Sequence, residues 1–334
     1  MYEKGRMRTK ITNYDGGVVT VPQKERHVQG RIRRDELAVW CGRWLGSRPT
    51  RVLFEVAHLS IVTGLRLADG REVVVKARPP ADRIHACVQV QRHLWAAGFP
   101  CPEPLAGPHA LGAMTATAEA LVPGGTRLEP GSDSAWLFAE ALANLVRLAP
   151  RPAHLPALTP PPAWACWDHD QPGTWPIPDD RHDDLNRHPE PAWLDEVGRR
   201  VRRRLAQCRQ PPVVGHADWE EPNLRWIDRR LHVVHDWDSV VSRPEAAIAG
   251  IAAAVFPGFG GPGAATLEES DAFLRAYEQV RGHPWSVDER QVCWAAGLWV
   301  RAYNAKKATL DSDGGALLER LTSEASERLC LAGA

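Results

Sequence analysis

The chain has 334 residues, of which 44% are hydrophobic and 25% charged, and this length allows two lobes that share a cleft. Lys plus Arg and Asp plus Glu both number 41, so the overall charge gives no sign of a nucleic-acid partner. No apolar run approaches the roughly 18 to 20 residues of a membrane helix, and residues 1–17 lack the apolar stretch of a secretory signal, so we expect a cytoplasmic protein with no membrane partner.

The first part of the chain is predicted to be rich in strands. Residues 1–32 show no clear periodicity and are expected to form an N-terminal extension. Apolar periodicity and turn residues then predict further elements. In chain order these are a helix over 34–45, a strand over 48–57, a hairpin that turns at Asp69-Gly70 with its second strand over 72–77, a helix over 84–97 and a strand from 113. Residues 33–122 are therefore expected to form an N-lobe with a sheet and a central helix.

The second part, residues 123–334, is predicted to be mainly helical and to form a C-lobe. Helices are expected over 134–148, 193–205, 245–255, 267–280, 287–306 and 316–331. Residues 150–191 are rich in proline and are expected to form a loop. The basic run "GRRVRRR" at 198–204 has apolar residues at helical spacing, which favours a solvated helix face over a nucleic-acid patch.

Polar side chains gather in "VVGHADWEEPNLRWIDRRLHVVHDWDSV", residues 213–240, where two short apolar runs end. Asp218 and Asn223 lie five positions apart on a predicted loop, and Asp236 follows the second run, after a hairpin. Carboxylate and amide oxygens suit Mg²⁺, which keeps several waters and also binds substrate phosphates. Asp218 is placed to accept the proton of a substrate hydroxyl.

This segment resembles the catalytic segment of the aminoglycoside phosphotransferase and choline kinase superfamily. "HADWEEPN" resembles its HGDxxxxN loop, with alanine in place of the glycine, and "VVHDWDSV" resembles its IDW strand end. The resemblance implies a bilobal, protein-kinase-like α+β fold, with a small antiparallel-sheet N-lobe and a larger helical C-lobe. It also implies that Asp218 is the catalytic base, that His216 braces the catalytic loop, that Asn223 and Asp236 hold Mg²⁺, and that Asp238 is an auxiliary group.

The same resemblance implies a nucleotide site for ATP or GTP in the N-lobe. Lys76 in "EVVVKAR" would meet the phosphates, and Glu119 and Leu121 lie in the expected adenine hinge. The loop "AHLSIVTG" is not glycine-rich, so Ser60 is the candidate to cover the phosphates. The helix after Lys76 contains no acid between residues 83 and 97, and Gln89 is expected to face the lysine, although a neutral amide supplies no Coulomb attraction.

The expected function is a kinase that phosphorylates a hydroxyl of a compact acceptor such as an antibiotic, an amino sugar or an amino alcohol. Trp219, Glu220 and Trp237 are candidates to line the acceptor pocket, although the tryptophans are equally suited to packing the loop and the glutamate to solvation. Two alternatives stay open. One is a nucleotide-binding pseudokinase or regulatory module, favoured by the missing helix acid. The other is a metal-dependent phosphohydrolase that uses His235-Asp236 as an HD ligand pair together with His216.

Overall fold

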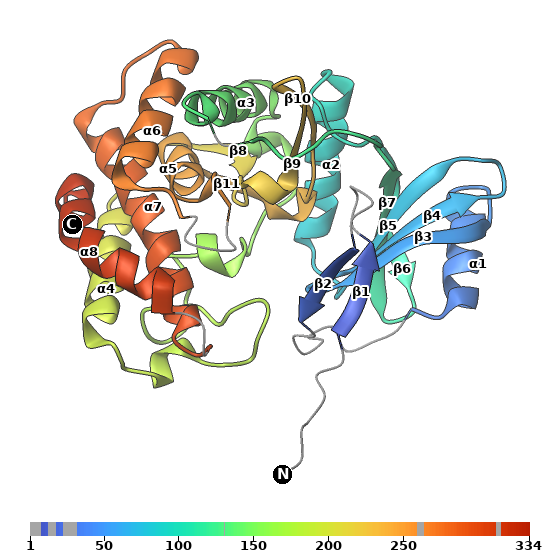
Figure 1. Ribbon diagram of the computed structural model, residues 1–334, viewed down its shortest axis with the longest axis horizontal. Helices are drawn as coiled ribbons and strands as arrows, with labels where there is room; N and C mark the ends of the chain where they lie inside the picture. The colour runs from blue at the N-terminus through green and yellow to red at the C-terminus, as the bar shows by residue number, and fades with distance from the viewer. Residues whose placement is uncertain (1–7, 13–17, 23–31, 130, 259–263, 312–314) are drawn as a thin grey trace.

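The computed structural model of the chain describes residues 8–12, 18–22, 32–129, 131–258, 264–311 and 315–334 (Figure 1). The expected N-terminal extension contains two strands, β1 (Arg8–Thr12) and β2 (Val18–Pro22), which pair antiparallel. Periodicity missed both of them. The other residues up to 31 lie outside the described part of the chain.

The N-lobe is built on a five-stranded antiparallel sheet with the strand order β3-β4-β5-β7-β6. Its strands are β3 (Pro49–Ala57), β4 (Ile61–Leu67), β5 (Glu72–Arg78), β6 (Pro104–Leu111) and β7 (Met114–Ala120). Two helices accompany the sheet, α1 (Arg34–Trp44) and α2 (Arg83–Ala96). The strand β6 was not predicted, because its Gly107-Pro108 pair interrupts the apolar pattern that marks a strand.

The strand β5 has different neighbours on its two faces. Side chains alternate along a strand, so Val73, Val75 and Ala77 point to one side, where they share a buried core with α1. Lys76 and Arg78 point to the other side, toward α2 and the C-lobe, where they line the same small cavity. The sheet therefore presents two cations, two residues apart, to the region between the lobes.

The C-lobe consists mainly of helices, as predicted. They are α3 (Ser134–Leu148), α4 (Ala192–Ala206), α5 (Glu245–Val255), α6 (Leu267–Arg281), α7 (Val287–Ala308) and α8 (Gly315–Ala332). The polar segment was expected to lie on one strand pair, but it lies on two. One pairs β8 (Pro212–His216) with β11 (Val240–Pro244), and the other pairs β9 (Leu224–Ile227) with β10 (Arg230–Val234). The expected α+β class with a sheet lobe and a helical lobe is confirmed.

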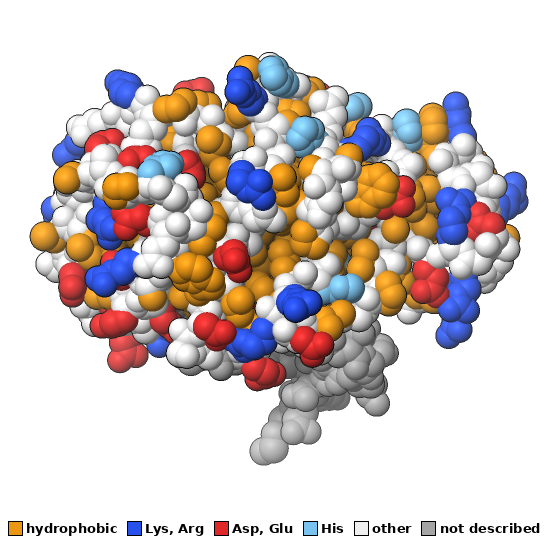
Figure 2. Space-filling model, turned by 90° about the horizontal axis from the view of Figure 1, so that it is seen from above, with side chains coloured by type: hydrophobic (Ala, Val, Ile, Leu, Met, Phe, Trp, Pro, Cys, Tyr) orange, Lys and Arg blue, Asp and Glu red, His pale blue; other side chains and the backbone are white. Residues whose placement is uncertain are grey.

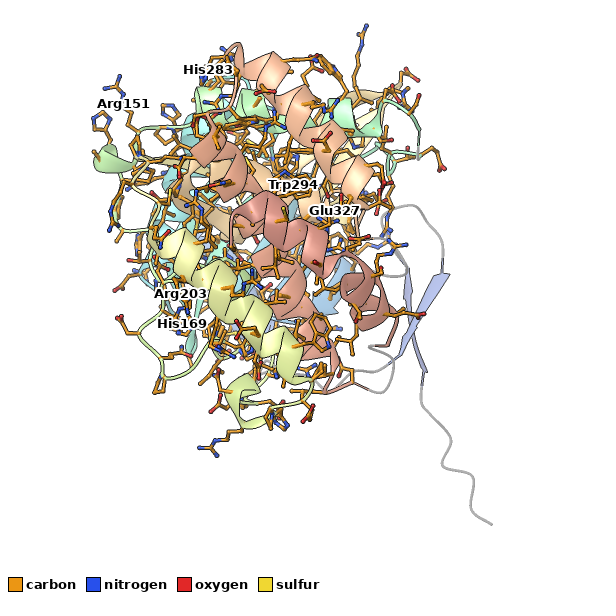
Figure 3. All side chains as sticks on the ribbon, turned by 90° about the vertical axis from the view of Figure 1, so that its left-hand side faces the viewer. Arg151, His169, Arg203, His283, Trp294 and Glu327 are labelled. Atoms are coloured by element: carbon orange, nitrogen blue, oxygen red, sulfur yellow. The ribbon has the colours of Figure 1, made fainter. Side chains whose placement is uncertain are left out.

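The proline-rich segment 150–191 is mostly irregular, as predicted, with only three short 3₁₀ turns. Arg202 of α4 fixes part of it by donating hydrogen bonds to the carbonyls of Trp167, His169 and Gly173 at 2.7, 2.6 and 2.6 Å. Arg203, labelled in Figure 3, is exposed on the same helix. The basic run is thus only partly a solvated face, because some of its arginines bind other segments of the protein.

On the face drawn in Figure 2, charges of both signs are mixed. In the view of Figure 2, Lys and Arg side chains are interspersed with Asp and Glu side chains on both lobes. None of the helices in the described ranges is both long and apolar enough to cross a bilayer.

Candidate active site

The catalytic-loop candidates follow β8. A 3₁₀ turn over Glu221–Asn223 brings Asn223 back toward Asp218. The Asn223 amide donates to the Asp218 carboxylate at 2.7 Å and to the Asp218 carbonyl at 2.9 Å. This contact holds the Asp218 side chain in one orientation.

His216 links the loop to the strand end that carries Asp236. Its Nε2 donates to the carbonyls of Asp236 and His235 at 3.0 and 3.2 Å, and its Nδ1 accepts from the Asp218 backbone N–H at 3.2 Å. Burial lowers the pKa of His216, which keeps the ring neutral. Because both ring nitrogens are engaged, His216 acts as a brace in this geometry.

Asp236 lies two residues after the end of β10 and has a left-handed backbone, at φ 62° and ψ 51°. This conformation costs roughly 1–2 kcal/mol for a residue with a Cβ, and the hydrogen bond from His216 to the Asp236 carbonyl helps to hold it. One carboxylate oxygen of Asp236 accepts from the Ser239 hydroxyl at 2.8 Å, and the other contacts Lys76. Burial alone would raise the pKa of Asp236, but the Lys76 ammonium, together with His216 and the Ser239 hydroxyl, outweighs burial and the pKa is lowered.

Lys76 reaches the C-lobe from β5. Its ammonium contacts Asp236, 160 positions away in sequence, and lies 2.8 Å from a carboxylate oxygen of Asp238. Burial opposes the charge on Lys76, but the two carboxylates outweigh burial and its pKa is raised. Lys76, Asp218 and Asp236 therefore converge on one site between the lobes.

Asp218 is strongly perturbed at this site. Burial, and after it the charge of Asp236, raises the pKa of Asp218 to about 7. A general base is most effective when its pKa lies near the working pH, so the environment of Asp218 suits proton transfer.

The prediction that Gln89 faces Lys76 is wrong. Gln89 is exposed on α2, whereas Gln91 is buried and donates to the Glu119 carboxylate at 2.8 Å and to the Pro102 carbonyl at 3.0 Å. Two residues along a helix are about 200° apart around its axis, so only one of the two glutamines can face the sheet. The helix thus places an amide, and no acid, in the small cavity that Lys76 also lines.

The hinge candidates have mixed outcomes. The Glu119 carboxyl lies in a cavity of about 30 Å³ that Lys76 also lines, and burial raises its pKa. The Leu121 backbone N–H donates to the Glu72 carbonyl at 3.0 Å, so the sheet already uses that donor. Ser60 lies in the bend between β3 and β4, two positions before Val62, which pairs with Lys76. Its role stays a prediction.

The two tryptophans proposed for the acceptor pocket are core residues instead. Trp219 and Trp237 are 0% and 4% exposed, and their indole N–H groups donate to the carbonyls of Phe138 and Val234. Their rings pack edge-on against His216 at centroid distances of 5.8 and 5.9 Å. The two tryptophan rings therefore help to hold the His216 imidazole in place. Glu220 is half-buried on the loop and stays a candidate.

Sequence reasoning missed several residues that contact the site, among them Trp164 and Arg78. Trp164 of the proline-rich segment donates from its indole N–H to the Ala217 carbonyl at 3.2 Å, which ties that segment to the catalytic loop. Arg78 contacts Asp238 and donates to the Thr117 hydroxyl at 2.7 Å. The spacing of Arg78 from Lys76 was a usable signal, because side chains two apart on a strand share a face.

The oxygen donors fit magnesium better than a transition metal. Asn223 and Asp236 supply amide and carboxylate oxygens, and Mg²⁺ takes its other ligands from water and phosphate. Among the described residues, no three His, Cys, Asp or Glu side chains gather as a metal site. The HD-type hydrolase is disfavoured, because both ring nitrogens of His216 are used in hydrogen bonds and His235-Asp236 ends a strand rather than lying on a helix.

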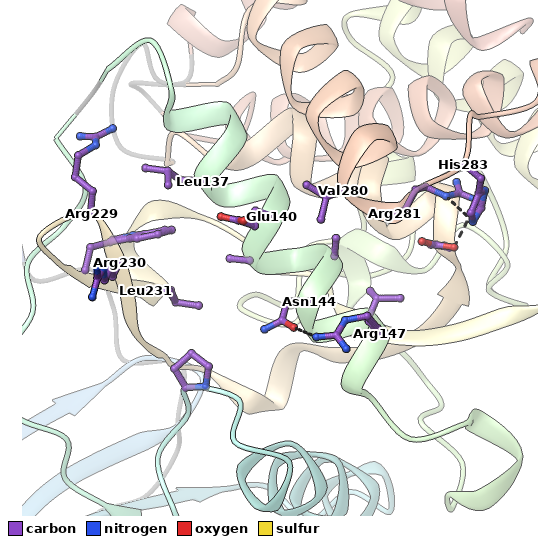
Figure 4. Close-up of a pocket in the computed structure, with 16 residues that line it drawn as sticks. Leu137, Glu140, Asn144, Arg147, Arg229, Arg230, Leu231, Val280, Arg281 and His283 are labelled. Atoms are coloured by element: carbon purple, nitrogen blue, oxygen red, sulfur yellow. Dashed lines mark hydrogen bonds and ion pairs between the residues drawn. The ribbon is translucent and has the colours of Figure 1, made fainter.

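A much larger cavity than the one at Lys76 lies elsewhere, between α3, the β9–β10 hairpin and the end of α6 (Figure 4). It has a volume of about 730 Å³, and Leu137, Asn144, Leu231 and Val280 are among the residues that line it. None of the candidate site residues named above, all in the described ranges, contributes to its lining. The candidate site is therefore identified by the charged side chains that meet there, and not by the volume of a cavity.

A model of the phosphotransferase enzyme family matches residues 63–294 of the chain. The match includes every candidate from Lys76 to Asp238 and more than half of the chain. No curated protein sequence matches the chain.

Solved structures with similar folds include three kinases or phosphotransferases, at identities that show the fold alone. An amicoumacin kinase in complex with AMP-PNP and Ca²⁺ has a TM-score of 0.60 at 13% identity, covering 84% of this chain and 89% of its own. The aminoglycoside phosphotransferase APH(4)-Ia with ADP and hygromycin B has a TM-score of 0.56 at 14% identity, covering 90% and 99%. A choline/ethanolamine kinase family protein from Mesorhizobium loti has a TM-score of 0.53 at 15% identity, covering 89% and 93%. The expected bilobal, kinase-like fold is confirmed.

Proposed function

The chain belongs to the phosphotransferase enzyme family, and from this premise we propose that it transfers the γ-phosphoryl group of ATP or GTP to a hydroxyl of a small-molecule acceptor. The observation that carries the proposal is the convergence of Lys76, Asp218 and Asp236 between the lobes. A cation, a base and a metal-capable carboxylate meet there from distant parts of the chain.

Asp218 is the proposed base. The acceptor oxygen forms a bond to the γ-phosphorus while the bond from that phosphorus to the bridging oxygen breaks, and the nucleoside diphosphate leaves. The proton of the acceptor hydroxyl passes to the Asp218 carboxylate, whose pKa of about 7 suits this transfer. Asn223 keeps the carboxylate oriented through its 2.7 Å hydrogen bond.

Lys76 and the bound Mg²⁺ would offset the negative charge of the nucleotide phosphates. The Lys76 ammonium is the proposed partner of the nucleotide phosphates. Asn223 and Asp236 would hold Mg²⁺, which neutralises negative charge on the phosphates when it is bound. The nucleotide and divalent cation in the solved amicoumacin kinase complex support both assignments.

The proposed acceptor is a compact, hydroxyl-bearing molecule such as an antibiotic, an amino sugar or an amino alcohol. Support comes from proteins of similar fold, one of which has been solved with hygromycin B and another with its amicoumacin substrate. Glu220, on the catalytic loop, is the remaining candidate for contact with a cationic acceptor.

A screen of ATP and GTP consumption across aminoglycosides, other antibiotics, amino sugars and amino alcohols tests the proposal. We expect at least one acceptor to give turnover that requires Mg²⁺. The isosteric change Asp218→Asn should lower kcat by about 10²-fold or more, while calorimetry still detects nucleotide binding. Asp228→Asn, at the exposed hairpin turn, is the matched control and should retain wild-type turnover. Full turnover by Asp218→Asn would refute the assignment of the base.

A further inference from the structure

We propose that Asp238 is the positioning residue for Lys76 and stands in for the acid that the helix α2 lacks. This inference rests on the proposed function, because it concerns how the nucleotide-binding lysine is oriented. In this proposal Asp238 orients Lys76, and Asn223 and Asp236 remain the proposed ligands of Mg²⁺.

The first support is the set of contacts at the Asp238 carboxylate. One oxygen lies 2.8 Å from the Lys76 ammonium and also contacts the Arg78 guanidinium. The side chains of Lys76, Arg78 and Asp238 are 20%, 10% and 27% exposed. Charges this far from bulk water interact more strongly than surface pairs, so these contacts can fix the direction of the lysine.

The second support is that Asp238 is itself held firmly from the N-lobe. Arg78 is fixed by its 2.7 Å hydrogen bond to the Thr117 hydroxyl on the neighbouring strand. Arg83, at the start of α2, donates to the carbonyls of Asp238 and Val240 at 2.5 and 2.6 Å. The planar, permanently charged guanidinium suits such a clamp. Both the side chain and the backbone of Asp238 are therefore anchored.

The third support is the charge balance. Two cations, Lys76 and Arg78, face two carboxylates, Asp236 and Asp238. A divalent cation on Asp236 would compete with Lys76 for that carboxylate, and the lysine would then keep its 2.8 Å contact with Asp238. On α2, Gln91 is occupied with Glu119, and the helix contains no acid that could pair with the lysine. Asp238 is the carboxylate that can stay with Lys76 throughout.

One consequence is that the lysine is positioned across the lobes. Asp238 belongs to the C-lobe and Lys76 to the N-lobe, so the pair forms only when the lobes have the arrangement seen here. Lysine orientation and lobe arrangement are then coupled.

The test compares Asp238→Asn with Asp238→Glu and with Asp228→Asn as the matched surface control. We expect Asp238→Asn to lower kcat/KM for ATP by about 10- to 100-fold, because the lysine loses a charged partner. Asp238→Glu should recover most of this loss. The Mg²⁺ concentration that gives half-maximal rate should be unchanged. A several-fold higher Mg²⁺ requirement would show Asp238 to be a metal ligand and would overturn the proposal.

A binding measurement separates positioning from a general defect. Calorimetry with AMP-PNP at saturating Mg²⁺ should show weaker binding for Asp238→Asn than for wild type. In a Lys76→Met background the same change should cause no further loss, because residues that act through one another are not additive. Additive losses would contradict the proposal. If wild type itself bound no nucleotide, the proposed function would fail, and not merely this inference.

If the Asp238→Asn variant does not fold, the Arg78→Gln variant is used to test the proposal instead. It loosens Asp238 but leaves both Asp238 and Lys76 charged. We expect a several-fold higher KM for ATP with an unchanged Mg²⁺ requirement, and an unchanged KM would overturn the proposal.

Discussion

At the residue scale, burial and nearby charge decide which groups carry a proton. Burial is the largest cause of both the lowered pKa of His216 and the raised pKa of Asp218, and the charge of Asp236 raises the pKa of Asp218 further. Asp236 is also buried, yet its pKa is lowered, because Lys76 lies against it. The pKa of Asp218 is thus raised while the pKa of Asp236, on a neighbouring segment, is lowered. This is the arrangement expected where one carboxylate accepts protons and the other stays charged.

His169 shows the effect of burial away from the active site and allows a pH prediction. It is 8% exposed, it contacts the Thr174 carbonyl at 3.1 Å, and burial lowers its pKa below the usual 6.5. Below pH 6.5 the unfolded chain binds a proton there that the folded chain resists, so the contribution of His169 to stability is present above pH 6.5 and is lost as pH falls through its folded pKa.

We therefore expect the unfolding free energy of wild type to fall more between pH 7.5 and pH 5 than that of His169→Gln. Urea denaturation at both pH values measures the difference. His182→Gln removes an exposed histidine and is the matched control, with the pH dependence of wild type. Equal slopes for wild type and His169→Gln would contradict the prediction.

At the element scale, the close crossing of α5 and α7 organises the C-lobe core. Every residue of α5 from Ala246 to Val255 is buried. Gly250 and Gly297 allow the two helix backbones to approach, since a Cβ on Gly250 would overlap the Cys293 carbonyl. The helix α5 follows β11 directly, so this crossing also supports the strand pair that carries His216.

Gly250→Ala should therefore destabilise the fold by about 2 kcal/mol or more, because the clash is with backbone and cannot be relieved by a rotamer change. Gly42→Ala is a matched control in α1, where the added Cβ would make only an ordinary 3.5 Å contact. That change should stabilise the protein by about 0.5 to 1 kcal/mol, since alanine favours helix. Chemical denaturation distinguishes the two, and a neutral Gly250→Ala would count against the described crossing.

At the scale of the whole molecule, charged contacts join the lobes. Lys76, Arg78 and Arg83 reach from the N-lobe to the segment 236–240, beside which the Val234 N–H donates to the Pro100 carbonyl at 2.9 Å. In Figure 1, α2 stands between the sheet and the helical lobe. A nucleotide with its metal would enter this charged junction and contact both lobes, so ligand binding should be visible in global stability.

We expect ADP with Mg²⁺ to raise Tm, with about 2.7 kcal/mol of stabilisation when free ligand exceeds its Kd 100-fold. A chelator should remove the metal-dependent part of this shift. It should leave the Tm of the protein alone unchanged, since the proposed Mg²⁺ site has only Asn223 and Asp236 as protein ligands and takes its other ligands from water and the nucleotide phosphates. Asn223→Ala should lose the metal-dependent shift, whereas Asn144→Ala, on α3, should keep it. A chelator that lowers Tm without nucleotide would instead indicate a resident metal.

The sequence alone determined the elements whose signal is local. Apolar periodicity located the helices α3 to α8 to within a few residues, and turn residues located the hairpin before Lys76. The spacing of Asp218, Asn223 and Asp236 pointed to the catalytic segment, because that chemistry needs its groups on one loop and one strand end. The strands β1, β2, β6, β9 and β11 escaped prediction, since short strands beside Pro, Gly or polar residues have little periodicity of their own.

Only the tertiary structure decided which of the candidates meet. Side-chain direction on α2 depends on how the helix docks, and this placed Gln91, and not Gln89, toward Glu119. The burial of Trp219 and Trp237 depends on neighbours from other elements. The carboxylates that contact Lys76 lie 160 and 162 positions away, at Asp236 and Asp238, because the folded chain brings β5 against the segment that follows β10. The local sequence pattern thus identified which chemical groups the site contains. Packing between the lobes decided which of these groups pair, because Coulomb attraction depends on distance in space and not on separation along the sequence.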